Sequence, residues 1–292
     1  MSATPASQPL PPQTHIGAVQ LIASSLDRSV RFWTETIGLV VHERGDDVAR
    51  LGAGGRELIV LEELRGATPI AGNSGLYHVA LLLPDVTDLA RWMVHAARER
   101  VPLSGLSDHL VSEAVYLDDP DGHGIEIYRD RPREDWTFDG DRVEMASLPV
   151  DTDRLLATLG LDDPRTAEFR GMPGGTTMGH VHFRVAEIAA TEAFYRDVLG
   201  FDLMAEFGEQ AAFLSAGGYH HHVGANVWTS RGAGPAPVGT ATLRHATIVL
   251  PDDASRNAAL GRVLDSGQEP VAGDGGVLVH DPSGNTLLLS VA

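Results

Sequence analysis

The stretch DHLVSEAVYLDDPDGHGIEIY, residues 108–128, contains two short apolar segments separated by the turn sequence DPDG. Proline and glycine interrupt regular structure, so this pattern predicts two strands joined by a tight turn. Glu126 lies inside the second apolar segment, while His109 and Tyr116 precede the turn. The segment VHDPSGNTLLL, residues 279–289, has the same pattern near the C-terminus. One structural unit is therefore expected to occur more than once in the chain.

Two further pairs of segments support this repetition. RSVRFWTETIGLVV (28–41) is similar to ATEAFYRDVLGFDL (190–203), and in both a glycine follows the helical spacing and suits a helix end. GLYHVALLLPD (75–85) is similar to TLRHATIVLPD (242–252), and both read as strands with a histidine near the start. Each half of the chain thus contains two units, and each unit is predicted to be a strand, a helix and three strands.

The predicted fold class is α+β, with four βαβββ modules in two tandem domains. We expect an N-terminal domain at 14–134 and a C-terminal domain at 176–292. Residues 135–175 form a linker, in which DTDRLLATLGL predicts a short helix. Residues 1–13 are rich in proline and serine and lack the basic and apolar regions of a signal peptide, so we expect a disordered tail.

Composition narrows the classes of function. The net charge of −18 and the lack of a basic segment argue against a nucleic-acid partner. No apolar run approaches the roughly 20 residues that a membrane span needs, so no membrane association is expected. The chain has no cysteine, which excludes disulfides and thiolate chemistry and favours a cytoplasmic location.

The four units with their DPxG turns resemble the vicinal oxygen chelate superfamily, which includes glyoxalase I, antibiotic-resistance proteins and type I extradiol dioxygenases. The pattern of the ring-cleaving extradiol dioxygenases is matched by His109, Tyr116, Pro120, Gly122 and Glu126. Ser107 is a departure, because the family prefers other residues there. The resemblance covers nearly the whole chain after residue 14 and implies a two-domain enzyme of the catechol 2,3-dioxygenase type.

The resemblance also implies where a metal would be bound, because ligands in this superfamily come from the first and last strands of the units. Unit two offers His78 and Glu126, and unit three offers His180. A buried carboxylate is costly unless it is paired or bound to a metal. Two histidines and one carboxylate are the ligand set of non-haem Fe(II) oxygenases. We therefore expect His78, Glu126 and His180 to hold the metal.

Units one and four lack a complete ligand set. Unit one has Ala18 at the position of His180, and His15, three residues earlier, is expected to point to the opposite face of its strand. Unit four has His245, but Leu288 replaces the glutamate. The expected site therefore requires units two and three to form one cup, and units one and four another. A site within the first half, with His15 in place of His180, is the alternative, and a second site at His15 or His245 stays open.

Three further residues are candidates for acid–base roles. The resemblance implies that Tyr116 hydrogen-bonds a substrate oxygen and that His109 contacts substrate at the mouth of the pocket. His220, His221 and His222 are predicted to lie in the last strand of unit three, where alternation would place only His221 inside the cup. His221 is therefore the expected acid–base catalyst, although a surface metal-binding tract is an alternative reading of three adjacent histidines.

The function that the resemblance implies is extradiol cleavage of a catechol by O2 to a hydroxymuconate semialdehyde-type product. The cofactor would be Fe(II), with Mn(II) as the alternative, and the partners would be a small aromatic diol, O2 and further copies of the chain in a homo-oligomer. One rival is a glyoxalase-like isomerase or lyase, which typically has two carboxylate ligands, whereas Val223 is expected at the second position here. The other rival is a metal-free drug-binding protein.

Overall fold

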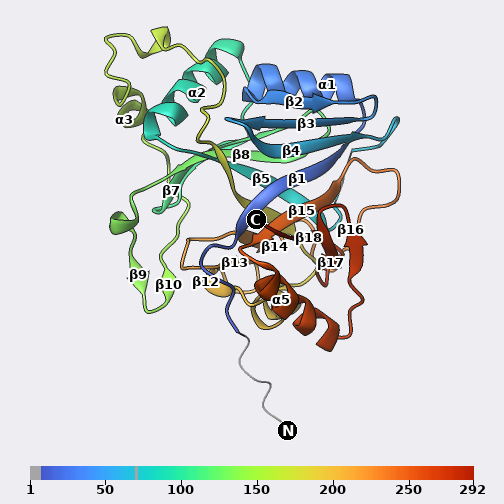
Figure 1. Cartoon of the computed structure of the whole chain (residues 1–292). Coiled ribbons are helices and arrows are strands. Elements are labelled where there is room, and N and C mark those ends of the chain that lie inside the picture. The colour runs from blue at the N-terminus through green and yellow to red at the C-terminus, as the bar shows by residue number, and fades with distance from the viewer. Residues whose placement is uncertain (1–7, 70–71) are drawn as a thin grey trace.

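The computed structural model describes residues 8–69 and 72–292, and within them four βαβββ units follow one another (Figure 1). Unit one comprises β1 (His15–Ala23), α1 (Leu26–Arg31) with the wider turn η1 (Phe32–Ile37), β2 (Val40–Arg44), β3 (Val48–Ala53) and β4 (Arg56–Glu63). Unit two comprises β5 (Gly75–Leu83), α2 (Val86–Glu99), β6 (Gly105–Asp108), β7 (Ser112–Asp118) and β8 (Gly124–Asp130). Unit three comprises β11 (Thr177–Arg184), α4 (Ile188–Ala193) with η4 (Phe194–Leu199), β12 (Asp202–Glu206), β13 (Ala211–Ser215) and β14 (Val223–Asn226). Unit four comprises β15 (Leu243–Leu250), α5 (Asp253–Asp265), β16 (Val271–Gly273), β17 (Gly276–His280) and β18 (Thr286–Val291). The predicted α+β fold class is confirmed.

The strands form two eight-stranded sheets, and each sheet combines units from opposite halves of the chain. One sheet has the order β16-β17-β18-β15-β1-β4-β3-β2 and joins units four and one. The other has the order β12-β13-β14-β11-β5-β8-β7-β6 and joins units three and two. The central pairs, β1 with β15 and β5 with β11, are antiparallel. The expected pairing of units two and three in one cup is confirmed.

The helices cover the outer faces of the sheets and bury their apolar sides there. Figure 1 shows α1 and α2 at one end of the molecule and α5 at the other. Trp33 of η1 and Trp92 of α2 are fully buried, and burial of one such side chain contributes about 3 kcal/mol. Gly38 ends the first helix with a φ of 95°, as its position in the sequence predicts. Within the described ranges, no helix is both long and apolar enough to cross a bilayer.

The linker contains short elements, some of which pack on the second sheet and some on helix α2. They are η2 (Arg133–Asp135), β9 (Phe138–Asp139), β10 (Arg142–Val143), α3 (Thr152–Ala157) and η3 (Pro164–Thr166). Helix α3 is the short helix predicted from DTDRLLATLGL. Its Arg154 forms an ion pair with Glu113 of β7, a fully buried carboxylate that also pairs with Arg129 and Arg131. This cluster holds the linker against the sheet that contains units two and three.

The described part of the expected N-terminal tail is packed against the protein. Leu10 is buried in the main apolar core, and its backbone N–H donates to the carbonyl of Gly200 at 2.8 Å. Residues 8–13 therefore differ from the predicted disordered segment, because one apolar side chain and one backbone hydrogen bond hold them in place. Residues 1–7 of that prediction lie outside the described residues.

Candidate metal centre and active site

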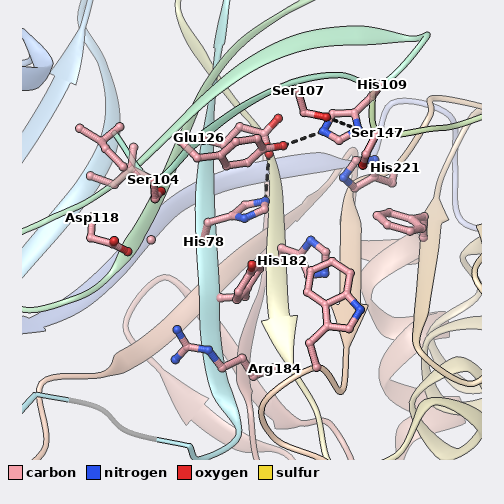
Figure 2. A pocket seen from close by; sticks show the side chains of 18 of the residues that line it. His78, Ser104, Ser107, His109, Asp118, Glu126, Ser147, His182, Arg184 and His221 are labelled. Carbon is pink, nitrogen blue, oxygen red and sulfur yellow. Dashed lines mark hydrogen bonds and ion pairs between the residues drawn. The ribbon is translucent and has the colours of Figure 1, made fainter. Parts of the chain in front are cut away.

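Three side chains from three neighbouring strands converge on one point. His78 comes from β5, Glu126 from β8 and His180 from β11. Oε2 of Glu126 lies 3.0 Å from Nε2 of His78 and 3.1 Å from Nε2 of His180, and the two Nε2 atoms are 3.3 Å apart. All three side chains are buried, and Figure 2 shows His78 and Glu126 pointing toward each other. The structure thus brings together the three residues expected to bind metal.

Strand register explains this convergence. Ala80 of β5 pairs with Glu126 on one side and with His180 on the other. These residues therefore form one row across the sheet, and the small side chain of Ala80 leaves the middle of the row free. His78 lies two residues earlier on β5, so it projects from the same face. The site exists because β8 and β11 both pair with β5, although they come from different halves.

The protonation states suit a divalent cation. Burial would raise the pKa of Glu126, but the adjacent rings of His180 and His78 hold this pKa well below its usual range. Burial lowers the pKa of His180 to about 4 despite the neighbouring carboxylate. An ionised carboxylate and a neutral imidazole are the forms that bind metals. With two imidazoles and one carboxylate, the donor set matches the ligands of a non-haem iron site.

The corresponding position in unit three has no side chain. In unit two, Ala80 lies two residues after the histidine His78 and pairs with Glu126. In unit three, His182 lies two residues after His180 and pairs with Gly224, so Gly224 is the equivalent of Glu126. The prediction that Val223 occupies this position was therefore wrong by one residue. A Cβ at Gly224 would lie 2.8 Å from Nδ1 of His182, so the histidine ring occupies the space. The amide of Asn226 donates to Nε2 of His182 at 3.0 Å, which occupies the lone pair of this nitrogen.

The other candidate ligands lie apart from this centre. His15 is exposed and contacts the carbonyl of Gln13 at the start of β1. In the other sheet, Leu288 pairs with Thr247, which lies two residues after His245. Glu126 pairs in the same way with Ala80, two residues after His78. Leu288 therefore occupies in unit four the position that Glu126 has in unit two. The structure therefore places neither His15 nor His245 with His78 and Glu126, and the alternative set with His15 is not assembled.

Tyr116 and His109 form one hydrogen-bonded pair beside the metal ligands. Nδ1 of His109 lies 2.7 Å from the carbonyl of Ala146, which can only accept, so this nitrogen carries the proton. In neutral His109, Nε2 then accepts from the hydroxyl of Tyr116 at 2.7 Å. Tyr116 also pairs with Glu126 across β7 and β8. Burial, reinforced by the charge of Glu126, raises the pKa of Tyr116 well above its usual value, so the phenol stays protonated.

The three adjacent histidines precede β14 and do not belong to it, because the strand begins only at Val223. The strand alternation used to predict their directions therefore does not apply directly. His221 lines the main cavity, whereas His222 lines a separate cavity with His15. His220 is fully buried, with Nδ1 2.7 Å from Nδ1 of His221 and Nε2 2.9 Å from a carboxylate oxygen of Asp130. The predicted direction of His221 thus agrees with the structure, for a different local reason.

His78 and Glu126 border a cavity of about 510 Å³. Figure 2 shows His109 and His221 near one side of it and Arg184 beyond His182. Several residues of its wall were not predicted from the sequence, namely Tyr77, Asp118, Met145, Ser147, Arg184, Phe207, Phe213 and Trp228. Alternation along β11 could have identified Arg184, which is four residues after His180 and therefore on the same face. Met145 and Ser147 come from the linker, and no sequence motif placed them there.

The model of the glyoxalase/bleomycin resistance protein/dioxygenase superfamily matches residues 15–127 and 177–289. The chain belongs to this superfamily. A protein of Bacillus subtilis (strain 168) named catechol-2,3-dioxygenase is 40% identical over 274 residues, which cover 92% of this chain and 94% of that protein. The superfamily membership predicted from the repeated units and the turn motif is thereby confirmed.

Solved structures of the superfamily fold are similar to this chain. A protein from Bacillus subtilis subsp. subtilis strain 168 has a TM-score of 0.67 at 14% identity, covering 98% of this chain and 86% of its own. Glyoxalase I from Zea mays has a TM-score of 0.57 at 16% identity, with 95% and 92% covered. At these identities the likeness shows the shared fold alone.

Proposed function

We propose that this protein is a metal-dependent extradiol dioxygenase that cleaves the ring of a catechol with O2. The observation that carries the proposal is the convergence of His78, Glu126 and His180 beside a cavity, with Gly224 where a fourth side chain would stand. Three protein ligands leave coordination positions for both oxygens of a diol and for O2. The 40% identical relative that is named catechol-2,3-dioxygenase supports the same activity.

Fe(II) is the proposed metal, with Mn(II) as the alternative, because imidazole and carboxylate ligands without a thiolate suit both. When bound, the metal would pass electrons from the diol to O2. The proposed product is a ring-opened semialdehyde of the hydroxymuconate type. We further propose a cytoplasmic enzyme that forms a homo-oligomer.

The side chains around the metal ligands supply orientation and proton transfer. The hydroxyl of Tyr116 lies next to Glu126 and can hydrogen-bond a diol oxygen, while His109 holds this hydroxyl in place. Nε2 of His221 makes no hydrogen bond among the described residues and borders the cavity, so it is available to exchange a proton with substrate. Aromatic side chains in the cavity wall, including Phe213 and Trp228, exclude water from the aromatic ring of the bound diol.

The two rival functions fit the site less well. A glyoxalase-like enzyme with two carboxylate ligands would need a side chain at Gly224, where the ring of His182 leaves no room for a Cβ. A metal-free binding protein would have no use for an ionised carboxylate buried between two imidazoles, because such an arrangement is costly without a cation.

The proposal is tested by loading the protein with Fe(II) without oxygen and then measuring O2 consumption with catechol. Glu126→Ala, His78→Ala and His180→Ala should each bind less than about a tenth of the parent's iron, since each removes one of three ligands. His15→Ala and His245→Ala are matched controls and should keep the parent's iron content. Iron retained by Glu126→Ala, or no O2 consumption by the iron-loaded parent with any catechol, would contradict the proposal.

A further inference from the structure

We propose that Arg184 binds a carboxylate on the substituent of the aromatic diol, so that the substrates are catechols with an anionic side chain. This inference rests on the proposed function and adds the chemical class of the substrate. It concerns the end of the cavity that lies beyond His182 when seen from Glu126 (Figure 2).

Register places Arg184 on the floor of the cup that holds the metal ligands. His180, His182 and Arg184 alternate along β11 and therefore share one face. Arg184 pairs with Gly75 of β5, which has no side chain to contact it, while His182 pairs with the ligand His78. His78 and Arg184 therefore lie along the same pair of strands, since Arg184 comes two residues after the partner of His78, which is about 7 Å along a strand.

The guanidinium of Arg184 is partly desolvated, and within the described residues Asp118 interacts with it electrostatically without forming an ion pair. It forms no hydrogen bond or ion pair with any residue in the ranges 8–69 and 72–292. It lies over the ring of Tyr77, 5.6 Å from the centroid. Burial lowers the pKa of Arg184, and Tyr77 and Asp118 only partly offset this effect. A buried cation favours a counter-ion, and the planar fork of arginine matches a carboxylate with two parallel hydrogen bonds.

The composition of the cavity wall supports a single anionic contact. Among the described residues that line the cavity, Arg184 is the only arginine or lysine. Asp118 also lines the rim but is exposed and forms no ion pair with Arg184 within the described chain. Its negative charge would repel an anionic substituent placed on its own side of the ring. The two charges together therefore favour one orientation, with the carboxylate toward Arg184.

The size of the cavity agrees with a substituted ring. Its volume is about 510 Å³, which is within the range of pockets for ligands of moderate size and larger than a bare diol needs. Trp228 and Phe207 extend the aromatic wall to the surface, where these residues are 49% and 43% exposed. A substituent that leaves the ring toward the mouth would pass these side chains.

The test uses a matched pair of substrates, a catechol with a propionate side chain and its neutral propionamide analogue. The parent enzyme should prefer the propionate by about tenfold or more in kcat/KM, the effect expected for a hydrogen bond to a charged group. Arg184→Gln should bring the ratio of the two substrates close to one. Arg184→Lys should restore part of the preference, because the charge returns without the fork.

A binding measurement separates this inference from the proposed function. The same two compounds are titrated, without oxygen, into protein loaded with Zn(II), and quenching of tryptophan fluorescence reports binding. Arg184→Gln should weaken binding of the propionate about tenfold relative to the amide, and Asp118→Asn should strengthen it. Equal binding of both compounds by the parent overturns the role of Arg184 whether or not the enzyme consumes O2. If binding discriminates but no catechol is cleaved, the proposed function fails and the anionic site stands.

Discussion

Glu126 is the residue whose position in an apolar strand most needs a physical reason. Its carboxylate is buried, yet it lies within 3.1 Å of two imidazole nitrogens, so a cation and two polar neighbours can offset the cost of desolvation. Removing one partner of a buried charged pair costs about 3–5 kcal/mol, which makes this cluster sensitive to substitution. The chemistry of the site depends on a few side-chain atoms, so a substitution that removes one of these atoms tests its role directly.

Tyr116→Phe removes one hydroxyl and leaves the shape of the side chain unchanged. Iron content should stay at the parent value, because Tyr116 is not one of the three proposed ligands. Turnover should fall by about tenfold to a thousandfold, as expected when a positioned hydrogen-bond donor is lost. The measurement is O2 consumption with catechol, normalised to bound iron.

His109 offers a matched comparison for the loss of this hydroxyl. If His109 acts by positioning Tyr116 and not by contacting substrate itself, its effect passes through the hydroxyl of Tyr116, 2.7 Å away. His109→Ala in the Tyr116→Phe background should therefore lower turnover much less than His109→Ala in the parent. Additive losses in the double variant, or unchanged turnover in Tyr116→Phe, would show that the two residues do not act as one pair.

At the scale of elements, the order of strands in the sheet determines which side chains meet. Strand β5 lies between β8 and β11, so residues far apart in the sequence become neighbours on one face. The turn before β14 has a comparable effect, because Gly217 and Gly218 adopt positive φ values of 65° and 68° and redirect the chain. The three histidines that follow therefore point in separate directions.

His221→Gln should retain iron and bind catechol with the parent's affinity, but it should slow the step that requires O2. His221 borders the cavity, and proton transfer requires a contact of about 3 Å or one bridging water. His222→Gln is the matched control, since His222 lines another cavity and is held by Ser215 and Ala216. Rapid mixing of the anaerobic enzyme–catechol complex with O2 isolates this step. A slow His222→Gln variant with a normal His221→Gln variant would contradict the assignment.

At the scale of the whole molecule, the proposed metal site joins the two halves of the chain. His78 and Glu126 belong to the first half and His180 to the second, and the central pair β5–β11 connects them. Any ligand that binds only the folded state increases its stability in proportion to the logarithm of ligand concentration over Kd. A metal bound here should therefore stabilise both halves together.

Addition of Mn(II) to the metal-free protein without oxygen should raise Tm, with a gain of about 2.7 kcal/mol at a hundredfold excess over Kd. Glu126→Gln should abolish this gain, because the neutral amide is a poor ligand for the cation. His245→Ala should show the full gain, since the other sheet has Leu288 where the glutamate would be. Differential scanning calorimetry provides the measurement. Equal stabilisation of Glu126→Gln and the parent would mean that the metal binds elsewhere.

Residues and their periodicity were sufficient to predict much of this protein. Repeated strand and helix patterns predicted four βαβββ units, since alternation and helical spacing are local properties of the chain. The comparison of equivalent positions between units identified His78, Glu126 and His180 as candidates, and it placed Leu288 correctly in unit four. Side-chain direction within a strand follows from residue number, so equivalent positions in different strands can be compared from their numbers alone.

Only the tertiary structure decided what depends on register, turns and contacts between distant segments. It placed Gly224 instead of Val223 opposite His182, and it separated His220, His221 and His222 from the strand that they precede. It also brought the linker to the cavity, where the carbonyl of Ala146 orients His109. Alternation along β11 already puts Arg184 on the face of His180, but the absence of an ion-pair partner for Arg184 among the described residues is a property of all its neighbours in space. Such features depend on which segments pair and pack, and local sequence patterns do not encode that choice.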